Sequence, residues 1–370
     1  MSDLEELRRR LDEIDDRLLG LAKERLDVVA EIKAIKKAEG RHLFDRDREQ
    51  QVHQRAEARA RGLGLDPLLG RDLIARLIEA SHHLQAEPED AAGSDGSRSI
   101  LVVGGRGRMG TMLGRAFAAR GHRIDVLEKG DELESSRIAA ADVVMVAVPM
   151  ADAVRVAAQV APHVRQGALI FDINSLKTEV CHALSRSGGE ALGTHPMFGP
   201  TVRSLRRQKV VLCDVKPGPA ARWLEGELGA MGAEVVKCSP DHHDAMMGIV
   251  QVLTHFGIMA MGRALRATGH TLDETLPFTS PIYRLELAMV GRLFSQKPEL
   301  YREIMLANPG GEAIRASFLE QAKQLAEIVE GDDADAFVEA FDEVRDYFAG
   351  FSDEAMDLSD HIIETIMARP

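Results

Sequence analysis

The first apolar pattern in the chain is a long stripe whose members are separated by alternating steps of three and four residues. It begins at Leu4 and Leu7 and continues past Ile32, a spacing typical of one face of an α-helix. No proline interrupts it, so we expect a helix of about 35 residues, roughly 50 Å long. A helix of this length cannot bury its stripe alone, and it therefore needs other helices or a second copy of the chain.

Two shorter helices are expected after this one. Asp45 has the side chain of an N-cap and opens a helix that ends at two glycines. Asp66 is followed by proline, which is favoured at the first position of a helix, and apolar residues then recur at helical spacing. Residues 86–97 are small, acidic and rich in glycine and serine, as in a linker. We therefore predict an all-helical domain over residues 1–88.

Beyond the linker, short apolar runs alternate with helical segments. The run 100–103 is apolar at every position, as expected of a strand buried on both faces of a parallel sheet. This succession predicts a Rossmann-like, doubly wound α/β domain over residues 98–240. The expected strands are 100–103, 123–128, 143–148 and 168–172, and the shorter runs 210–213 and 233–236 extend the sheet.

Strand signals disappear after residue 240, and the remaining chain has the spacing of long helices broken by prolines. We predict that residues 241–370 form an all-α domain that supplies a dimer interface or closes a substrate cleft. The expected protein is therefore multidomain, with an N-terminal three-helix domain, a central α/β domain and a C-terminal all-α dimerisation domain. A homodimer is the expected assembly.

Composition and charge exclude several classes of protein. Hydrophobic residues make up 45% and charged residues 28% of the 370 residues, close to soluble globular averages. A net charge of -13 disfavours nucleic-acid binding, because a polyanion would be repelled. The longest apolar run found, Ala139 to Val148, is interrupted by Asp142, and the N-terminus is charged, so neither a membrane span nor a signal peptide is expected. Three irregularly spaced cysteines predict reduced thiols in a cytoplasmic protein, without a metal site.

A glycine-rich turn follows the first predicted strand. Gly105, Gly107 and Gly110 form a G-x-G-x-x-G pattern that opens a helix, as in turns that bind a dinucleotide pyrophosphate. Glu128 ends the next strand, near the ~20-residue offset of the acid that binds the adenosine ribose. A carboxylate there accepts from both ribose hydroxyls and repels a 2′-phosphate, so NAD is the expected cofactor.

Other residues near this turn complete the predicted cofactor site. Arg108 and Met109 lie within the glycine motif, and Val148 and Pro149 end the third strand, where they would form one wall of the cleft. Arg106, Arg108 and Lys129 weaken the preference for NAD, because any of them is able to bind the extra phosphate of NADP.

Oxidation of a carbinol needs a base that accepts the hydroxyl proton while hydride leaves. Histidine has a suitable pKa, and His195 lies between a glycine and a proline in a segment where a turn is expected. Arg284 and Arg292 lie ~80° apart around one predicted helix, so one of them is able to face a substrate carboxylate while the other makes internal pairs.

The strongest resemblance to a known family rests on three segments: GGRGRMG, THPMFGP and SPIYRLELAMVGRLF. Together they resemble prephenate dehydrogenase, and the similarity extends from Ser97 to the C-terminus. The resemblance implies NAD-dependent oxidative decarboxylation of prephenate to 4-hydroxyphenylpyruvate. It also implies that His195 takes the proton of the C4 hydroxyl, that Arg292 holds a carboxylate, and that Ser175 contacts the hydroxyl or His195. Lys177 and Arg284 are lesser candidates.

The first ninety residues resemble the helical chorismate mutase that is fused to prephenate dehydrogenase or dehydratase. The chain as a whole therefore resembles a bifunctional enzyme of tyrosine biosynthesis that converts chorismate to prephenate and then oxidises prephenate. The rearrangement is unimolecular and needs fixed cations and a donor to the ether oxygen. The matching positions are Arg8 from a partner subunit, Arg25, Lys36, Asp45, Arg48, Glu49, Ser81 and Gln85.

Within this set, the resemblance makes Lys36 and Gln85 donors to the ether oxygen and places Glu49 on the chorismate hydroxyl. Helix geometry agrees that Arg25 and Lys36 serve one pocket and Arg8 another, because Arg25 and Lys36 lie ~20° apart on one face. Arg8 points about 100° away from Arg25, as required for donation to a neighbouring subunit.

Regulation and two alternative functions complete the sequence interpretation. The resemblance implies feedback inhibition by L-tyrosine, for which His255 is a candidate contact. In one alternative, the helical module is a non-catalytic dimerisation or ligand-sensing domain. In the other, the chain is a different Rossmann dehydrogenase that acts on a 3-hydroxy acid, but this leaves the first ninety residues and the His195 segment without an explanation.

Overall fold

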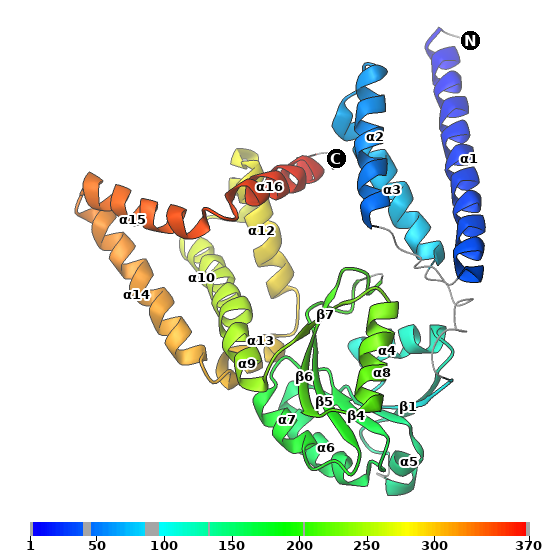
Figure 1. The fold of residues 1–370 in the computed structure, drawn as a ribbon. Coiled ribbons are helices and arrows are strands. Elements are labelled where there is room, and N and C mark those ends of the chain that lie inside the picture. The colour runs from blue at the N-terminus through cyan, green and yellow to red at the C-terminus, as the bar shows by residue number, and fades with distance from the viewer. Residues whose placement is uncertain (1–2, 40–45, 86–95, 132–133, 203, 368–370) are drawn as a thin grey trace. The chain divides into compact units, whose positions relative to one another are not determined.

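The computed structural model describes residues 3–39, 46–85, 96–131, 134–202 and 204–367. These form two compact units, one with residues 1–97 and 115–123 and the other with residues 98–114 and 124–370. The predicted N-terminal helices, central sheet and C-terminal helices are all confirmed (Figure 1).

Three helices make up the N-terminal module: α1 (Asp3–Ala38), α2 (Arg46–Gly62) and α3 (Pro67–Gln85). Helices α2 and α3 lie side by side, and a glycine lets them approach closely. A Cβ at Gly70 would lie 2.7 Å from the Cβ of Ala60 and 2.9 Å from the carbonyl oxygen of Ala56. The predicted start of α2, Asp45, lies outside the described residues.

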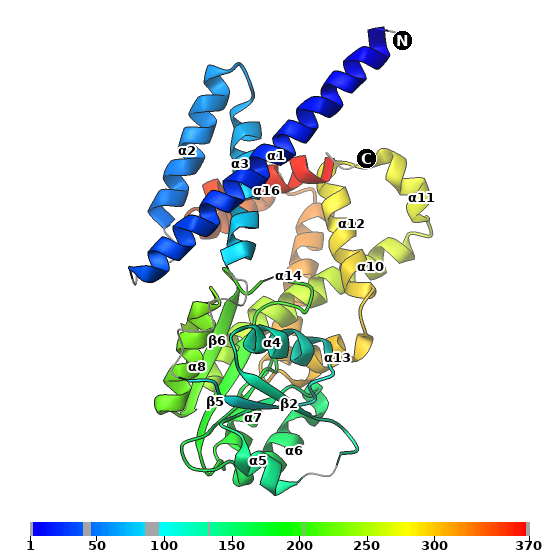
Figure 2. The ribbon, with the colours of Figure 1, turned by 90° about the vertical axis from the view of Figure 1, so that its right-hand side faces the viewer.

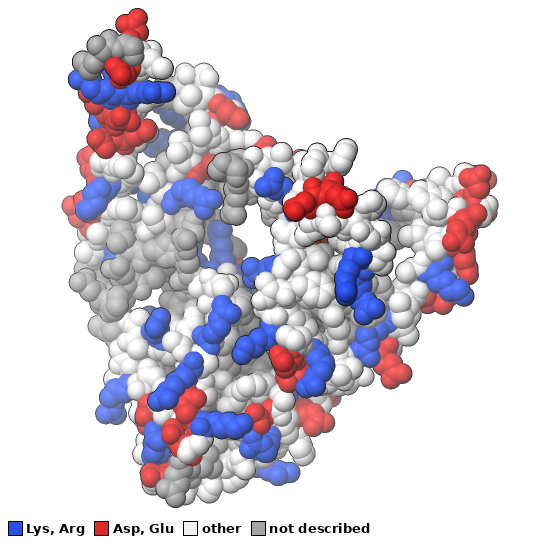
Figure 3. All heavy atoms as spheres, turned by 180° about the vertical axis from the view of Figure 1, so that it is seen from behind, with Lys and Arg blue, Asp and Glu red and all other residues white. Residues whose placement is uncertain are grey.

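Helix α1 is 36 residues long, as its stripe predicts, and most of that stripe faces outward. Leu7, Leu11 and Leu18 are 53%, 59% and 57% exposed. Acidic and basic side chains mix along its polar surface, at the upper left of Figure 3, and include the pairs Arg9–Glu6 and Lys23–Asp27. Within the described part of its own module, the apolar face of α1 therefore remains largely exposed.

A single sheet in the order β2-β1-β3-β4-β5-β6-β7 forms the centre of the second unit. Strands β1, β3, β4 and β5 are parallel neighbours, β6 runs antiparallel to β5, and β7 is parallel to β6. The strand bounds are β1 Ser99–Val103, β2 Arg123–Leu127, β3 Val143–Val146, β4 Leu169–Asp172, β5 Glu190–Pro196, β6 Lys209–Lys216 and β7 Glu234–Lys237.

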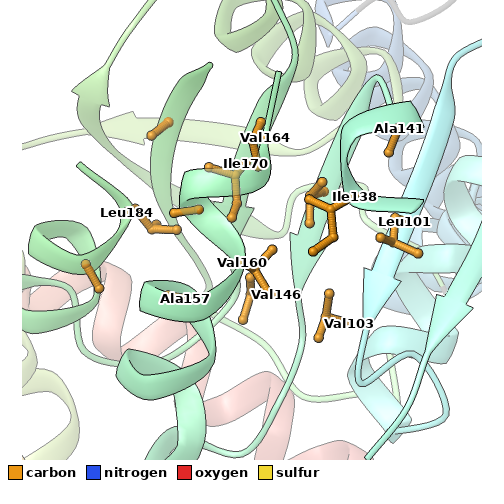
Figure 4. Packing of buried hydrophobic residues seen from close by; sticks show 14 of the residues in the cluster. Leu101, Val103, Ile138, Ala141, Val146, Ala157, Val160, Val164, Ile170 and Leu184 are labelled. Atoms are coloured by element: carbon orange, nitrogen blue, oxygen red, sulfur yellow. The ribbon is translucent and has the colours of Figure 1, made fainter. Parts of the chain in front are cut away.

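The core lies where the parallel strands meet their covering helices. Val146 and Ile170 on neighbouring strands pack against Val160 of α6, and Ile138 of α5 closes the cluster from another side (Figure 4). The continuous apolar strands found in the sequence are thus buried on both faces. The helices around the sheet are α4 Arg108–Ala119, α5 Ser135–Ala140, α6 Met150–Val160, α7 Thr178–Leu184 and α8 Pro219–Ala230, with the 3₁₀ turn η2 Ala161–His163.

The C-terminal part is helical and extends away from the sheet (Figures 1 and 2). Prolines open α9, α12 and α13 at their first helical positions, where the missing N–H costs no hydrogen bond. The elements are α9 Pro240–Met247, the π-helix η3 Gly248–Leu253, α10 Thr254–Ala267, α11 Leu272–Thr275, η4 Leu276–Phe278, α12 Pro281–Phe294, α13 Pro298–Ala307, α14 Gly311–Glu330, α15 Ala334–Phe348 and α16 Ser352–Met367.

One expectation about apolar runs needs correction. The continuous helical run Pro240–Ala267 is longer than 139–148 and is apolar enough, by length and composition alone, to pass for a membrane span. Two of its residues, His243 and Asp244, are buried and hydrogen-bonded to one another. The run also packs against β6 and α14, so it is an integral part of the folded unit.

Candidate active sites

The glycine-rich loop joins β1 to α4 and passes very close to β3. Gly104 has φ +83°, and a Cβ there would lie 2.8 Å from the carbonyl oxygen of Ala147. A Cβ at Gly105 would lie 2.9 Å from the Val126 side chain, and one at Gly110 would lie 3.0 Å from the Gly104 oxygen. The tight turn that the sequence predicts is thus centred on Gly104, one residue before the G-x-G-x-x-G pattern.

Glu128 lies beside this loop, as its position in the sequence predicts. Its Oε1 atom accepts a hydrogen bond of 2.6 Å from the backbone N–H of Arg106. The Gly107 N–H donates to the Gly104 oxygen at 3.1 Å, and α4 begins at the next residue. Arg106, Arg108 and Lys129 are all exposed around the loop.

The end of β3 supplies a second wall. Val148 contacts the glycine loop, because its Cγ1 atom would lie 2.9 Å from a Cβ at Gly104, and Pro149 caps α6. Beyond the neighbouring strand β4, Asn174 is 7% exposed and its Nδ2 has no hydrogen-bond partner among the described residues. A glycine-rich loop after β1 and an unpaired buried donor after β4 therefore lie at the carboxyl ends of strands on either side of β3, where dinucleotides bind in this type of sheet. This geometry fits NAD.

His195 lies in strand β5 rather than in the expected turn. The side chain is 4% exposed. Its Nδ1 atom lies 2.9 Å from Nε2 of His243, and Nδ1 of His243 lies 2.7 Å from Oδ1 of Asp244. Burial holds the pKa of His195 well below its usual value, the positive Lys177 and nearby His243 add to that effect, and Asp244 opposes it. His195 is therefore held as a neutral imidazole.

A buried ion pair fixes the strands around His195. Lys177 and Asp172 are both 0% exposed, and Nζ of Lys177 bonds Asp172 and also donates to the Thr194 oxygen at 2.8 Å. The backbone N–H of Thr194 donates to Asp172 at 3.2 Å. Because a buried pair is tolerated only when its remaining groups are hydrogen-bonded, this arrangement is a rigid support. Lys177 was predicted as a lesser candidate for substrate contact, and the structure places it in this support.

The other predicted residues of this half lie in two places. Ser175 is half-buried in the loop that follows β4, and His195 bonds His243 in the described structure rather than Ser175. Arg284 and Arg292 are both exposed on α12. The two arginines are thus exposed in this chain, whereas His195 is buried.

Tyr301, which the sequence analysis did not single out, lies near both Arg292 and His255, the predicted regulatory residue. Burial raises the pKa of Tyr301, and the positive charge of Arg292 partly offsets this rise. The Tyr301 ring meets the ring of His255 edge-on, with centroids 5.0 Å apart. Nδ1 of His255 is buried without a partner among the described residues, and burial lowers the pKa of this histidine. Tyr301 is thus buried, His255 is half-buried, and Arg292 is exposed beside them.

In the N-terminal module, the structure brings together two of the predicted mutase residues. The Arg25 guanidinium on α1 donates to Oγ of Ser81 on α3 at 2.7 Å and to the Leu77 oxygen at 3.0 Å. Burial lowers the pKa of Arg25, although the group remains a cation at any physiological pH. A positive charge is thus fixed between the first and third helices.

The remaining predicted mutase residues lie near helix ends. Lys36 is in the last turn of α1 and Glu49 in the first turn of α2, both half-buried and engaged in interactions with other groups. Gln85 is the last residue of α3, and its side chain lies outside the described structure, as does all of Asp45. Arg8 is exposed on α1, and Arg48 is exposed with its Nη1 3.4 Å from Gln51.

Sequence reasoning missed the partners of His195. His243 and Asp244 belong to the segment DHHD directly after the proline that opens α9, and this cluster of titratable residues was the available signal. It was not informative by itself, because α9 is remote from β5 in the sequence and only the packed structure brings the two histidines together.

Comparison with known families covers nearly the whole chain. Residues 7–86 match chorismate mutase type II, residues 114–233 match the nucleotide-binding domain of prephenate dehydrogenase, and residues 239–343 match its dimerization domain. A prephenate dehydrogenase from A. aeolicus, solved with hydroxyphenyl propionate and NAD⁺, has the same fold at 19% identity. It has a TM-score of 0.57 and covers 70% of this chain and 99% of its own.

Two curated relatives are similar over nearly their full length. The T-protein of Enterobacter agglomerans is 32% identical over 350 residues, 94% of each chain. The T-protein of Haemophilus influenzae is 30% identical over 366 residues, which is 98% of this chain and 97% of that protein. The chain thus belongs to the T-protein family and is a bifunctional chorismate mutase and prephenate dehydrogenase of tyrosine biosynthesis.

Proposed function

We propose that His195 is the general base of the dehydrogenase. The observation that carries this assignment is its place near the carboxyl end of β5, buried and neutral, beside the end of β4. In the proposed reaction its free ring nitrogen accepts the C4 hydroxyl proton of prephenate as hydride leaves C4. The ring carboxylate departs as CO₂, its bonding electrons make the ring aromatic, and the C4 oxygen takes the proton back from His195 to give 4-hydroxyphenylpyruvate. Aromatisation makes this direction effectively irreversible.

NAD⁺ is the proposed cofactor, and when bound it supplies the hydride acceptor. The loop at Gly105, Gly107 and Gly110, with Arg108 and Met109, would hold its pyrophosphate against backbone N–H groups. Glu128 now accepts a hydrogen bond from the Arg106 N–H. With NAD⁺ bound, it would instead accept hydrogen bonds from the ribose hydroxyls. Val148 and Pro149 would border the cofactor, and Asn174 offers an unpaired donor nearby.

Substrate binding in the dehydrogenase is assigned to Arg292, which would pair with a prephenate carboxylate. Its positive charge lies near buried Tyr301 and acts on the pKa of that side chain, and a carboxylate bound close to buried groups pairs more strongly than in bulk water. Arg284 on the same helix is a second candidate. Ser175, near the end of β4, would contact the substrate hydroxyl.

For the mutase, the fixed Arg25–Ser81 pair supports a pocket that lies between α1 and α3. Arg25 and Arg48 would bind the two carboxylates of chorismate, together with Arg8 from a second subunit. Lys36 and Gln85 would donate to the ether oxygen. Glu49, with Asp45, would bind the substrate hydroxyl side of the pocket.

The assembly is proposed to be a homodimer. The apolar stripe of α1 is largely exposed, and residues 239–343 match a dimerization domain, so both ends of the chain have a surface for a second copy. We place the domains at residues 1–88, 98–240 and 241–370. The described cysteines are free thiols, which agrees with a cytoplasmic enzyme.

L-Tyrosine is the proposed feedback inhibitor. It retains the ring and side-chain carboxylate of the substrate, and the cluster of Arg292, Tyr301 and His255 offers a cation, an aromatic ring and an unpaired ring nitrogen. Titration of dehydrogenase activity with tyrosine tests this assignment, and no response at millimolar concentrations would remove it.

Both activities of the purified full-length chain test the proposed roles together. Chorismate loss and NADH formation from prephenate are measured separately, with NAD⁺ and NADP⁺ compared. We expect a clear preference for NAD⁺. Equal use of NADP⁺ would show that the exposed basic residues around the loop outweigh Glu128.

A further inference from the structure

The hydrogen bonds behind His195 form a chain with a defined direction. Asp244 receives the backbone N–H groups of Lys177 and Thr178, each at 2.8 Å, in addition to the ring of His243. Together these donors lower the pKa of the Asp244 carboxyl, although its burial opposes them. Asp244 is therefore an ionised carboxylate, which has acceptors and no donor to offer.

This carboxylate determines which nitrogen of each histidine carries a proton. Because Oδ1 of Asp244 only accepts, Nδ1 of His243 must donate, and when that ring carries this one proton its Nε2 is an acceptor. Nδ1 of His195, 2.9 Å away, must in turn donate to that acceptor. A neutral His195 that donates from Nδ1 leaves its Nε2 unprotonated.

We propose that His243 and Asp244 are positioning residues that hold His195 in the tautomer whose Nε2 is free to accept the hydroxyl proton of the substrate. This inference rests on the proposed role of His195 as the base. Neither residue touches the reacting atoms. They act through His195, as second partners of catalytic or metal-binding imidazoles generally do.

The same chain also favours the product of proton transfer. When His195 accepts a proton on Nε2, its Nδ1–H remains bonded to His243, which remains bonded to the Asp244 carboxylate. No proton moves along the chain in this step. The positive charge on His195 is connected through His243 by hydrogen bonds to the negative Asp244 carboxylate. Lys177 opposes this charge, because it also lies near His195, but its own charge is paired with Asp172.

The positioning pair is itself held rigidly. Asp244 is tied to the start of α7 by the two backbone N–H groups, and Asn308, which follows α13, donates from Nδ2 to the Asp244 carbonyl oxygen at 2.8 Å. The rings of His195 and His243 meet edge-on with centroids 5.1 Å apart. Thus α9, in the region that matches the dimerization domain, orients a base on the nucleotide-binding sheet.

Two substitutions of His243 distinguish its role in orienting the His195 ring from its role in packing. In His243→Asn the side-chain amide is able to donate to Asp244 but is too short to accept from His195. In His243→Gln the longer side chain carries an oxygen to the place of Nε2 and restores an acceptor. We expect kcat of the dehydrogenase to fall roughly 10²- to 10³-fold in His243→Asn, and to stay within about tenfold of the parent in His243→Gln.

Three controls accompany this pair. KM for prephenate and for NAD⁺ should change little in either variant, because no binding group is removed. The mutase activity of the same full-length protein reports that each variant is folded. His242→Asn changes the exposed neighbouring histidine and should leave kcat unaltered. Equal kcat losses in His243→Asn and His243→Gln, or no loss in either, would overturn the proposal.

A spectroscopic measurement reads the tautomer directly. In the ¹⁵N-histidine-labelled full-length enzyme, the signals of His195 are assigned by their disappearance in His195→Asn. We expect a protonated Nδ1 and an unprotonated Nε2 in the parent, with the opposite tautomer gaining population in His243→Asn. A protonated Nε2 in the parent enzyme would refute the inference.

The outcomes also distinguish this inference from the assignment on which it rests. If His195→Asn keeps its NADH formation, His195 is not the base and both ideas fail. If His195→Asn loses turnover while His243→Asn retains it, His195 remains the base and only the positioning role of His243 and Asp244 is wrong.

Discussion

The region around His195 and the N-terminal helical module differ in how far one chain alone buries and pairs the proposed functional side chains. Around His195, the charged and polar groups lie inside the protein and bond one another, and Lys177 and Asp172 are fully buried. In the helical module, the described residues that are buried are only Ala60, Ile78 and Ser81, and the leucine stripe of α1 is exposed.

This difference has a physical origin. A doubly wound sheet buries both faces under its own helices, so its strand ends can hold unsolvated polar groups in fixed places. Three helices have too little interior for this, and a long amphipathic helix needs a partner for its apolar side. We therefore expect the dehydrogenase to be damaged mainly by changes within one chain and the mutase also by changes between chains.

The largest expected effect comes from the buried site. His195→Asn should reduce dehydrogenase turnover by about 10²- to 10⁴-fold, the usual range for loss of a general base. Chorismate mutase activity should remain at the parent level, because His195 lies outside that module. NADH formation and chorismate loss measure the two effects in one preparation, and His182→Asn, an exposed histidine on α7, is the matched control. Near-normal NADH formation would contradict the role of His195.

The corresponding test of the mutase is Lys36→Ala. If Lys36 donates to the ether oxygen as proposed, its removal costs roughly 10²- to 10³-fold, so chorismate consumption should fall by that amount while NADH formation from prephenate persists. Lys23→Ala, on the exposed side of the same helix, controls for loss of a helix charge. Unchanged chorismate consumption would support a non-catalytic role for the helical module.

A smaller effect is expected at Arg292, the proposed substrate-binding arginine. Arg292→Gln should raise KM for prephenate by roughly 10- to 100-fold, because a hydrogen bond to a charged group contributes about 1.5–3 kcal/mol. Turnover at saturation should change much less, since the lost contact exists in the ground state. Arg266→Gln, exposed on α10, is the control. A prephenate saturation curve that matches the parent would exclude this contact.

The proposed dependence of the mutase on a second chain is tested at the apolar stripe. Leu11→Gln removes an apolar side chain whose burial is worth about 2 kcal/mol in each copy. We expect mutase activity to fall several-fold on dilution, at concentrations where the parent is unaffected, with dehydrogenase activity maintained. Glu13→Gln introduces the same side chain off the stripe and serves as the control. Equal dilution curves for all three proteins would show that α1 does not pair through this face.

The smallest expected effect concerns pH and stability. The pKa of His195 is held well below 6.5 in the folded protein, chiefly by burial. Below pH 6.5 the unfolded chain therefore binds a proton that the folded chain does not, and stability falls as pH falls toward the folded pKa. Each pKa unit of difference corresponds to about 1.4 kcal/mol.

Trp223, the only tryptophan in the sequence, makes this measurement possible in the sheet-containing unit. Its fluorescence should report a denaturation midpoint that decreases between pH 6.5 and lower values. The decrease should be smaller in His195→Asn, which lacks the titrating group. A midpoint that rises on acidification in the parent would contradict the neutral, buried state of His195.

Local patterns in the sequence predicted much of the fold. The sequence analysis found the α1 stripe, the proline-opened helices and the uniformly apolar strands. Helical periodicity and burial on both faces of a sheet each produce a recognisable pattern of apolar residues along the chain. Strand β5 was missed. Its segment, EALGTHP, contains a glycine and a proline that resemble turn signals, and its strand character depends on pairing with β4 and β6.

The sequence by itself determined the helices, the parallel strands, the glycine loop with its acid and the family, because each of these depends on residues close together in the chain or on long matching segments. Only the tertiary structure decided that His243 and Asp244 stand behind His195, that Lys177 is a buried support, and that Tyr301 lies beside His255. These contacts join elements far apart in the sequence, and the free energy that selects them comes from the burial and hydrogen bonding of the whole packed unit.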